Sequence, residues 1–329
     1  MAASAESDGE TQGAARARAR DASSLADAVI VRCDCGSFRR GFRAVEHAGK
    51  AIARGAPQRR KSAGIENTLD MKIALLHLAP SPGAVRRNQN LIETALQLAA
   101  DSGAEWAVTP ELATTGYGFS DIIGTNWIER QPDGWVRSIA AFAGNRRLAV
   151  FLSVPERGET KLFNTVIAID RTGRIVGRHS KINTLSVGAE AWSSAGPSPE
   201  AVRLDDFGPV GVLVCADACS PSIAQDLAAR GARALVSSAA WPPGRHGPDG
   251  EWEAVSKATS LPVFVCNRTG WESVLDFTLG ESVVAFGGRR VVSLASATSS
   301  IFLVDWDFSD HRLIGCVQIL VPSPAANPG

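Results

Sequence analysis

Hydrophobic and polar positions follow two alternating patterns from Met71 onward. Short apolar runs rich in Val, Ile and Leu predict buried β-strands, whereas apolar residues that recur every three to four positions predict amphipathic helices. The helical spacing is clear in residues 84–104, where Gly103 marks the end of the helix. The apolar positions of this helix are Leu91, Ile92, Ala95, Leu96 and Leu98.

Strands and helices alternate along this part of the chain, and hairpins are inserted between them. Buried strands combined with hairpins predict an α/β layered fold with mixed strand directions. The hairpins are expected at 162–181 and 281–296. Strands are expected at 72–79, 105–112, 148–156, 162–170, 175–181, 208–215, 233–241, 262–270, 281–288, 290–296 and 299–307, and helices at 84–104, 134–147, 220–232 and 250–261.

The first 70 residues differ from the rest because they are rich in Ala, Arg, Gly and Ser and lack clear hydrophobic periodicity. Three interpretations are open: a flexible tail, translated sequence upstream of a functional start at Met71, or a targeting peptide. Acidic residues near the start argue against a targeting peptide. We expect residues 1–70 to be an N-terminal extension that is flexible or not part of the functional domain, residues 71–308 to form that domain, and residues 309–329 to be a C-terminal tail.

Composition narrows the class of protein. The chain has 329 residues, 45% of them hydrophobic, and its 34 basic residues balance 34 acidic ones. A net charge of zero gives no reason to expect nucleic acid or an anionic membrane as a partner, and no apolar run reaches the roughly 18 residues that span a bilayer. Six cysteines without framework spacing are typical of a reduced intracellular protein. We therefore expect a cytoplasmic globular protein.

A cysteine stands at the end of the predicted strand GPVGVLVC, where a turn must lead into the next helix. Enzymes of the α/β class present nucleophiles at such positions, at the carboxyl edge of a sheet and beside the backbone N–H groups of a helix start. Those N–H groups and the helix dipole favour a thiolate. Cys215 is therefore a candidate nucleophile. The alternative is a small buried hydrophobic residue, as most free cysteines are.

Two other ionisable residues stand at the ends of predicted strands. Glu111 follows the run EWAVTP, and Lys181 follows RIVGRHS. Each alone is an ordinary salt-bridge residue, but together with Cys215 they would share one edge of a sheet. A carboxylate can take the thiol proton, the thiolate can attack a carbonyl carbon, and an ammonium can stabilise the oxyanion. No histidine has a matching position, so a Cys-His arrangement is less plausible.

Four motifs resemble those of the carbon–nitrogen hydrolase (nitrilase-amidase) superfamily, and the likeness covers residues 71–308. TPELATTGY resembles the glutamate motif and places the general base at Glu111. GRHSKINTL resembles the lysine motif and places the oxyanion lysine at Lys181. GVLVCADACSPSIAQDLAARGA resembles the cysteine motif and places the nucleophile at Cys215. GAEAWSSAG resembles the segment that holds a second glutamate in amidase and carbamoylase members, here Glu190.

The chain also departs from the family pattern close to the triad. Ala216 stands where members often have an aromatic residue, and Cys219 and Ser222 stand where they often have Arg and Glu. In the lysine motif, His179 and Asn183 replace the residues that are usual there. These differences leave the implied reaction class unchanged and leave the substrate open.

The resemblance implies a fold, a reaction and an assembly. The fold would be a four-layer αββα sandwich with two mixed sheets, and members usually form homodimers through the helices beside the active site. The reaction would be hydrolysis of a carbon–nitrogen bond in a small linear amide or N-carbamoyl compound, through a cysteine thioester that releases ammonia or an amine. Lys181 and the backbone N–H of Ala216 would hold the oxyanion, and Glu190 would orient the base, the lysine or the substrate. No metal or organic cofactor is required.

Weaker candidates for substrate contact are Tyr117, Trp192, Trp241 and Asp217. Core packing is the alternative for the two tryptophans, and Asp217 could instead cap the following helix. Within the family, the rival functions are nitrile hydrolysis and acyl transfer on the same triad. Outside that chemistry, the rivals are a binding protein that keeps the fold without turnover, and thiol redox chemistry between Cys215 and Cys219.

Overall fold

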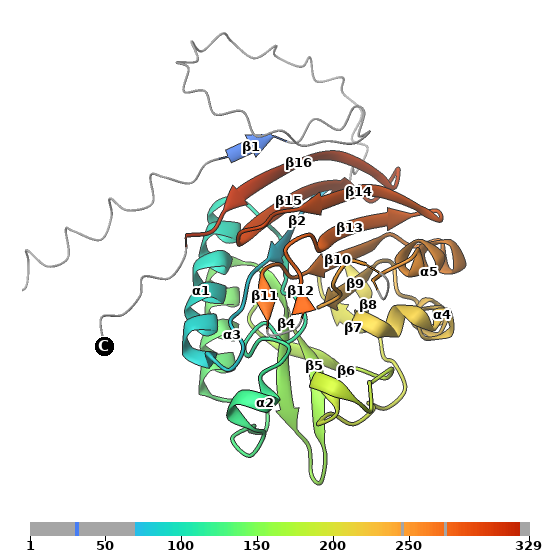
Figure 1. Ribbon diagram of the computed structural model, residues 1–329. Helices are drawn as coiled ribbons and strands as arrows, with labels where there is room; N and C mark the ends of the chain where they lie inside the picture. Colours follow the sequence, from blue (N-terminus) through green and yellow to red (C-terminus); the bar gives the residue numbers. More distant parts are fainter. Residues whose placement is uncertain (1–29, 33–69, 245–246, 273–274, 323–329) are drawn as a thin grey trace, which may run out of the picture.

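Two mixed β-sheets pack face to face, and helices cover the outer side of each sheet (Figure 1). The computed structural model describes residues 30–32, 70–244, 247–272 and 275–322. The order of layers, helix–sheet–sheet–helix, confirms the predicted αββα sandwich. Each sheet buries one face against the other sheet and the opposite face against helices, which explains why the central strands read as nearly continuous apolar runs.

Among the described residues, the larger sheet has eight strands in the order β1-β16-β15-β2-β3-β4-β5-β6. Its centre, β2-β3-β4, is parallel, and the strands on both sides pair antiparallel. The strand predicted at 105–112 is shorter than expected and leaves its last residues outside the sheet. The strands are β1 (Ile30–Arg32), β2 (Asp70–His77), β3 (Trp106–Val108), β4 (Ala149–Arg157), β5 (Leu162–Ile169), β6 (Ile175–Ser180), β15 (Ser300–Asp307) and β16 (Arg312–Leu320).

Within the part of the chain that the structure describes, the smaller sheet has six strands in the order β14-β13-β10-β9-β8-β7. Strands β8, β9 and β10 run parallel, so their carboxyl ends meet at one edge of this sheet. A separate hairpin, β11 (Trp271–Glu272) with β12 (Leu275–Asp276), follows β10. The strands of the sheet are β7 (Val202–Leu204), β8 (Gly208–Val214), β9 (Leu235–Ala239), β10 (Val263–Asn267), β13 (Glu281–Phe286) and β14 (Arg289–Ala295).

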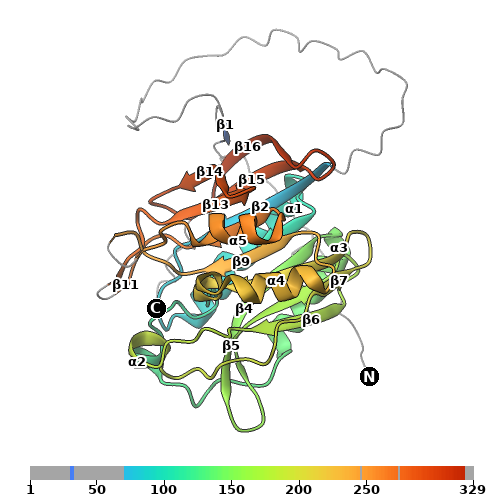
Figure 2. The same cartoon turned by 90° about the vertical axis from the view of Figure 1, so that its right-hand side faces the viewer.

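Helices α1 and α3 cover the larger sheet, and α4 and α5 cover the smaller one (Figures 1 and 2). All five apolar positions predicted for the first helix are buried in α1, which confirms the predicted face. No helix within the described ranges is long and apolar enough to cross a membrane. The helices are α1 (Val85–Asp101), α2 (Ser120–Ile123), α3 (Gly134–Arg146), α4 (Pro221–Ala229) and α5 (Glu251–Thr259).

Aromatic and branched side chains fill the space between the sheets. Trp306 of β15 packs edge-on against Phe264 of β10, with ring centroids 5.6 Å apart, and this contact joins the two sheets. Trp106 of β3 lies with its ring centroid 4.8 Å from that of Phe207. Burying an aromatic side chain of this kind stabilises the fold by about 2–3 kcal/mol, so these contacts hold the strand ends of the two sheets together.

The C-terminal boundary expected at residue 308 is wrong. Strand β16 pairs antiparallel with β15 along its whole length and belongs to the larger sheet. Its sequence RLIGCVQIL mixes polar and apolar positions and is only partly buried, so a search for continuous apolar runs misses it. Strand β1 lies inside the segment expected as an extension and pairs with β16. Residues 1–29 and 33–69 lie outside the described residues, and the expected boundary at residue 70 stays a prediction.

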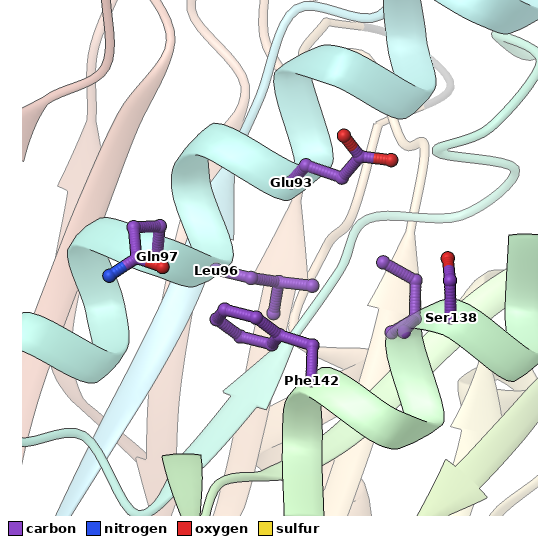
Figure 3. Close-up of a pocket in the computed structure, with 6 residues that line it drawn as sticks. Glu93, Leu96, Gln97, Ser138 and Phe142 are labelled. Carbon is purple, nitrogen blue, oxygen red and sulfur yellow. The ribbon is translucent and has the colours of Figure 1, made fainter. Parts of the chain in front are cut away.

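A groove lies between α1 and α3 in the helical layer that covers the larger sheet (Figure 3). None of the residues predicted for the site lines it. The groove is lined by Glu93, Leu96, Gln97, Ser138, Ile139 and Phe142.

Candidate active site

The thiol of Cys215 stands at the sharp turn that ends β8. Its φ of +45° is a left-handed conformation, which costs a non-glycine residue about 1–3 kcal/mol, and the residue is 6% exposed. Burial raises the pKa of this thiol well above its ordinary value, and the charge of Glu111 adds to the effect, whereas Lys181 and the backbone N–H of Ala240 oppose it. The thiol is therefore protonated at rest and needs a base to become a nucleophile.

The carboxylate of Glu111 lies just beyond β3 and is fully buried. Its Oε1 accepts hydrogen bonds from Nζ of Lys181 and Nδ2 of Asn164, both at 2.8 Å. Its Oε2 accepts a hydrogen bond from the backbone N–H of Ala240 at 3.0 Å. These three donors compensate the cost of burying the carboxylate. Among hydrogen bonds between described residues Oε2 receives this one alone, so it keeps the capacity to take a proton.

The ammonium of Lys181 lies between two carboxylates. Its Nζ donates to Glu111 at 2.8 Å and to Glu190 at 2.7 Å, and the side chain is 1% exposed. Burial alone would lower the pKa of Lys181, but the negative charges around it, Glu111 first, raise that pKa well above its ordinary value. The lysine is therefore a fixed positive charge at neutral pH.

Glu190 is buried, in the 3-10 helix Gly188–Glu190, and belongs to the same cluster. Its Oε2 accepts from Lys181 at 2.7 Å and from the Tyr117 hydroxyl at 3.4 Å, and its Oε1 accepts from Asn164 at 3.1 Å. Burial raises the pKa of Glu190, and the nearby charge of Glu111 raises it further. The structure thus brings together the four residues for which the sequence predicts a catalytic role.

None of the four motifs includes Asn164, which bridges the two carboxylates with its amide Nδ2. The available signal was a polar residue inside the apolar run LFNTVIAID of β5. A buried polar side chain in such a run must find partners. Because Asn164 holds both carboxylates, it fixes their orientation relative to each other.

Both sheets contribute to this cluster. The larger sheet places Glu111 after β3, Asn164 in β5 and Lys181 after β6, whereas the smaller sheet places Cys215 after β8 and Ala240 after β9. A backbone hydrogen bond from Glu111 N to the carbonyl of Ala239, at 3.2 Å, joins the two groups across the sandwich. The site therefore depends on how the sheets face each other.

Aromatic side chains surround part of the cluster. Tyr117 packs edge-on against Phe277, with ring centroids 6.5 Å apart, and its hydroxyl reaches Glu190. Trp192 belongs to the same apolar cluster and packs against Phe119 at 5.1 Å between centroids. Trp241 packs instead against Trp252 of α5 and the main core. Tyr117 is thus in contact with the site, and substrate contact by Trp192 and Trp241 stays a prediction.

Both oxygens of Asp217 are occupied by protein donors in a fully buried position, which favours a structural role, and its substrate contact stays a prediction. Oδ1 accepts from the backbone N–H groups of Ile182 and Asn183 at 3.0 and 2.9 Å. Oδ2 accepts from the N–H of Val214 at 3.0 Å and contacts Nε2 of His179 at 2.8 Å. Asp217 therefore ties the turn at Cys215 to the loop that follows Lys181.

Ala216 and Asn183 complete this connection. The Nδ2 of Asn183 donates to the carbonyl oxygen of Ala216 at 2.9 Å and to Oγ of Ser220, also at 2.9 Å. The first of these bonds fixes the peptide plane between Ala216 and Asp217. A residue of the lysine motif therefore holds the turn after Cys215, and the oxyanion role of the Ala216 N–H stays a prediction.

We predict that Asp217→Asn destabilises the protein by about 3 kcal/mol at neutral pH, because an amide nitrogen would face donors that the carboxylate now accepts. Burial alone would raise the pKa of Asp217, but the hydrogen bond and charge of His179 and the backbone donors lower it below the ordinary 3.8. A lowered carboxyl pKa contributes stability that is present above the ordinary pKa and is lost as pH falls through the folded-state pKa.

Urea unfolding of both proteins between pH 3 and pH 8 tests this prediction. The stability difference between wild type and Asp217→Asn should be full at neutral pH and shrink once the pH falls below about 3.8. A difference that does not change with pH would contradict the stabilising role of the ionised carboxylate.

The position of a possible cation in the site is taken by Lys181, which lies between Glu111 and Glu190. No group of three His, Cys, Asp or Glu side chains that could hold a metal ion occurs in the part of the chain that the structure describes. The Lys181 ammonium is thus a positive charge held between these two carboxylates.

Solved structures share the sandwich. A carbon-nitrogen hydrolase from Helicobacter pylori G27 superposes with a TM-score of 0.62 at 20% identity, covering 74% of this chain and 90% of that chain. An amidase from Nesterenkonia sp. AN1 in complex with butyramide superposes with a TM-score of 0.64 at 26% identity, covering 74% of this chain and 94% of that chain. The fold is therefore that of the nitrilase superfamily.

The family model described as carbon-nitrogen hydrolase matches residues 72–314, and the chain belongs to this family. A probable nitrilase from Schizosaccharomyces pombe is 22% identical over 250 residues, covering 73% of this chain and 90% of the relative. The 2-oxoglutaramate amidase of Bacillus subtilis is 27% identical over 213 residues, covering 63% of this chain and 80% of the relative. The family predicted from the four motifs is thus confirmed, and the relatives support a hydrolase.

Proposed function

We propose that this protein hydrolyses a carbon–nitrogen bond of a small linear amide or N-carbamoyl compound through a thioester on Cys215. One observation carries the proposal. Oε2 of Glu111 accepts the N–H of Ala240 after β9, and Cys215 follows β8, the parallel neighbour of β9, so the base and the nucleophile stand at adjacent strand ends. Nζ of Lys181 binds the other oxygen of that carboxylate at 2.8 Å.

In the first half-reaction, Oε2 of Glu111 takes the thiol proton while the sulfur of Cys215 attacks the carbonyl carbon. Negative charge then develops on the carbonyl oxygen, where the Lys181 ammonium and the N–H of Ala216 stabilise it. Glu111 returns its proton to the nitrogen of the substrate, and the carbon–nitrogen bond breaks. Ammonia or an amine leaves, and the acyl group remains on sulfur as a thioester.

In the second half-reaction, the same carboxylate takes a proton from water as the water oxygen attacks the thioester carbon. The carbon–sulfur bond breaks, the acid product leaves, and the proton returns to sulfur. Oε1 of Glu111 stays bound to Lys181 and Asn164 throughout, so only Oε2 exchanges protons. Because the two oxygens have separate roles, one carboxylate can act as acid and base without rotating.

Glu190 orients this machinery in our proposal. Its contacts with Lys181, Asn164 and the Tyr117 hydroxyl set the position of the ammonium and of the bridging amide. An amide substrate has N–H groups that can donate hydrogen bonds to a second carboxylate, whereas a nitrile group has none. The buried Glu190 therefore supports amide or carbamoyl hydrolysis over nitrile hydrolysis. Cytoplasmic location and assembly as a homodimer stay predictions.

An activity screen over small amides, N-carbamoyl compounds and nitriles tests the proposal. We expect ammonia or amine release from members of the first two classes, and mass spectrometry of the protein mixed with substrate should show an acyl group on Cys215. Added hydroxylamine should divert the thioester to a hydroxamate, and preferential diversion by other amines would indicate an acyltransferase. Turnover of nitriles alone, or amide turnover without an acyl adduct, would contradict the proposed reaction.

A further inference from the structure

A second buried ion pair lies next to the loop that follows Glu111. Glu272 of β11 is 2% exposed and pairs with Arg268, which is fully buried. Oε1 of Glu272 accepts the backbone N–H of Tyr117 at 3.1 Å, and Oε2 accepts that of Gly118 at 2.8 Å. The carboxylate therefore binds two successive backbone donors on the residues that carry the Tyr117 side chain.

Arg268 is held on several sides. Its Nη2 donates to the carbonyl oxygen of Pro80 at 3.0 Å and to that of Thr269 at 3.3 Å. Its guanidinium carbon lies 4.5 Å from the centroid of the Phe277 ring, which in turn packs edge-on against Tyr117. Burial lowers the pKa of Arg268 to about 9, while the charge of Glu111 opposes this effect. The guanidinium thus remains charged at neutral pH.

The loop is shaped around the Glu272 carboxylate. Gly116 has a φ of +74°, and a Cβ at this position would lie 2.8 Å from Oε1 of Glu272 and 2.7 Å from Cα of Pro82. Only glycine tolerates both the backbone conformation and this proximity. Glycine at this position therefore lets the loop pass directly against the Glu272 carboxylate.

The ion pair and the ring contacts both constrain the position of the Tyr117 hydroxyl. Glu272 fixes the backbone of Tyr117, Arg268 fixes Glu272, and Phe277 contacts both the guanidinium and the tyrosine ring. The hydroxyl of Tyr117 donates a hydrogen bond to Oε2 of Glu190, which also accepts one from Nζ of Lys181. A buried ion pair that stabilised only the fold would contribute little more than packed apolar residues of similar volume.

We propose that Arg268 and Glu272 are positioning residues, which act on the site through Tyr117 by holding its hydroxyl against Glu190; this inference rests on the proposed hydrolase function. Neither residue contacts the reacting atoms. Their effect passes through one side chain, so it should disappear when that side chain loses its hydroxyl. This consequence separates a positioning role from general stabilisation of the fold.

A double-mutant cycle with Glu272→Gln and Tyr117→Phe tests the proposal on the full chain. We expect each single variant to lower kcat by about tenfold with little change in KM, because misplacement of a positioning group costs that order of rate. The double variant should be no slower than the slower single variant. Multiplicative losses, or an unchanged kcat in Glu272→Gln, would overturn the proposal.

A control for stability alone is Asp170→Asn. Asp170 is also buried, also pairs with an arginine, Arg174, and also accepts two backbone N–H groups, those of Thr172 and Arg174. Asp170 follows the last residue of β5, whereas Asn164 lies near the beginning of that strand, so the two residues are about 20 Å apart along it. Asp170→Asn should lower the melting temperature and leave kcat unchanged. A fall of kcat in this control equal to that in Glu272→Gln would overturn the positioning role.

Alkylation of Cys215 by iodoacetamide gives a second measurement that needs no turnover. Its rate, read at Cys215 by peptide mass spectrometry, reports how well the thiol is activated. It should fall in both single variants and fall no further in the double variant. If the protein turns over no amide, the proposed function fails, but the same cycle of alkylation rates still decides the positioning role. Additive effects on alkylation would exclude it.

Discussion

Replacement of Cys215 by alanine is expected to abolish amide turnover while the fold remains intact. Loss of a catalytic nucleophile costs on the order of 10⁴-fold or more in kcat. The change removes one sulfur atom from a position that is nearly buried, so the loss of stability should be only about 1 kcal/mol. Ammonia release and the melting temperature, measured on the same preparation, check both parts of this prediction.

Cys219→Ala is the matched control for this prediction. Cys219 is exposed and stands in the same turn, Cys215–Cys219, so its replacement perturbs the same segment. We expect near-wild-type kcat for it and an acyl adduct that forms on Cys215. Equal losses from both alanine variants would instead favour redox chemistry between the two thiols. Substantial turnover in Cys215→Ala would exclude the thioester mechanism.

The layered fold could be predicted because most strands are buried on both faces and read as apolar runs. A strand that is only partly buried lacks a continuous apolar run, so this pattern does not reveal it. Strand β16 mixes polar and apolar positions near the edge of its sheet, which is why its residues fall within the predicted tail. Strand β3 has three residues, although the predicted run continued to Leu112. Beyond Val108 the chain leaves the sheet to place Glu111 in the site, so apolar residues there reflect burial without strand pairing.

The proximity of the residues of the proposed triad could be predicted because each of them stands next to a strand with a recognisable motif. The residues that support the triad could not be predicted in the same way. Asp217 was expected to contact substrate, yet its partners Ile182 and Asn183 lie 34 to 35 positions away in the chain. Glu272 lies 155 positions from Tyr117. Such contacts depend on how the sheets are placed, and single-chain patterns carry no information about pairing over these separations.

Glu111→Gln and Glu190→Gln should separate the two buried carboxylates by the size of their effects. Glutamine keeps the shape of each side chain and removes its capacity to take a proton. We expect kcat to fall by about 10³–10⁴ in Glu111→Gln, since general base catalysis is lost, and by on the order of 10² in Glu190→Gln, since only orientation is lost. Single-turnover acylation, followed by mass spectrometry at Cys215, checks the order of the two effects.

The stability of Glu190→Gln decides how its kinetic effect is interpreted. Burial raises the pKa of Glu190, so the ionised form is disfavoured where it lies, and glutamine relieves that cost. The same change weakens the contact with Lys181, which is 2.7 Å in the wild type. Because these effects oppose each other, the melting temperature should change little while kcat falls. If kcat stayed close to that of the wild type, Glu190 would be removed from the catalytic group, which would then consist of Glu111, Lys181 and Cys215. If instead both variants lost activity equally, the carboxylates would act as one proton-sharing pair, and the assignment of the base to Glu111 alone would be wrong.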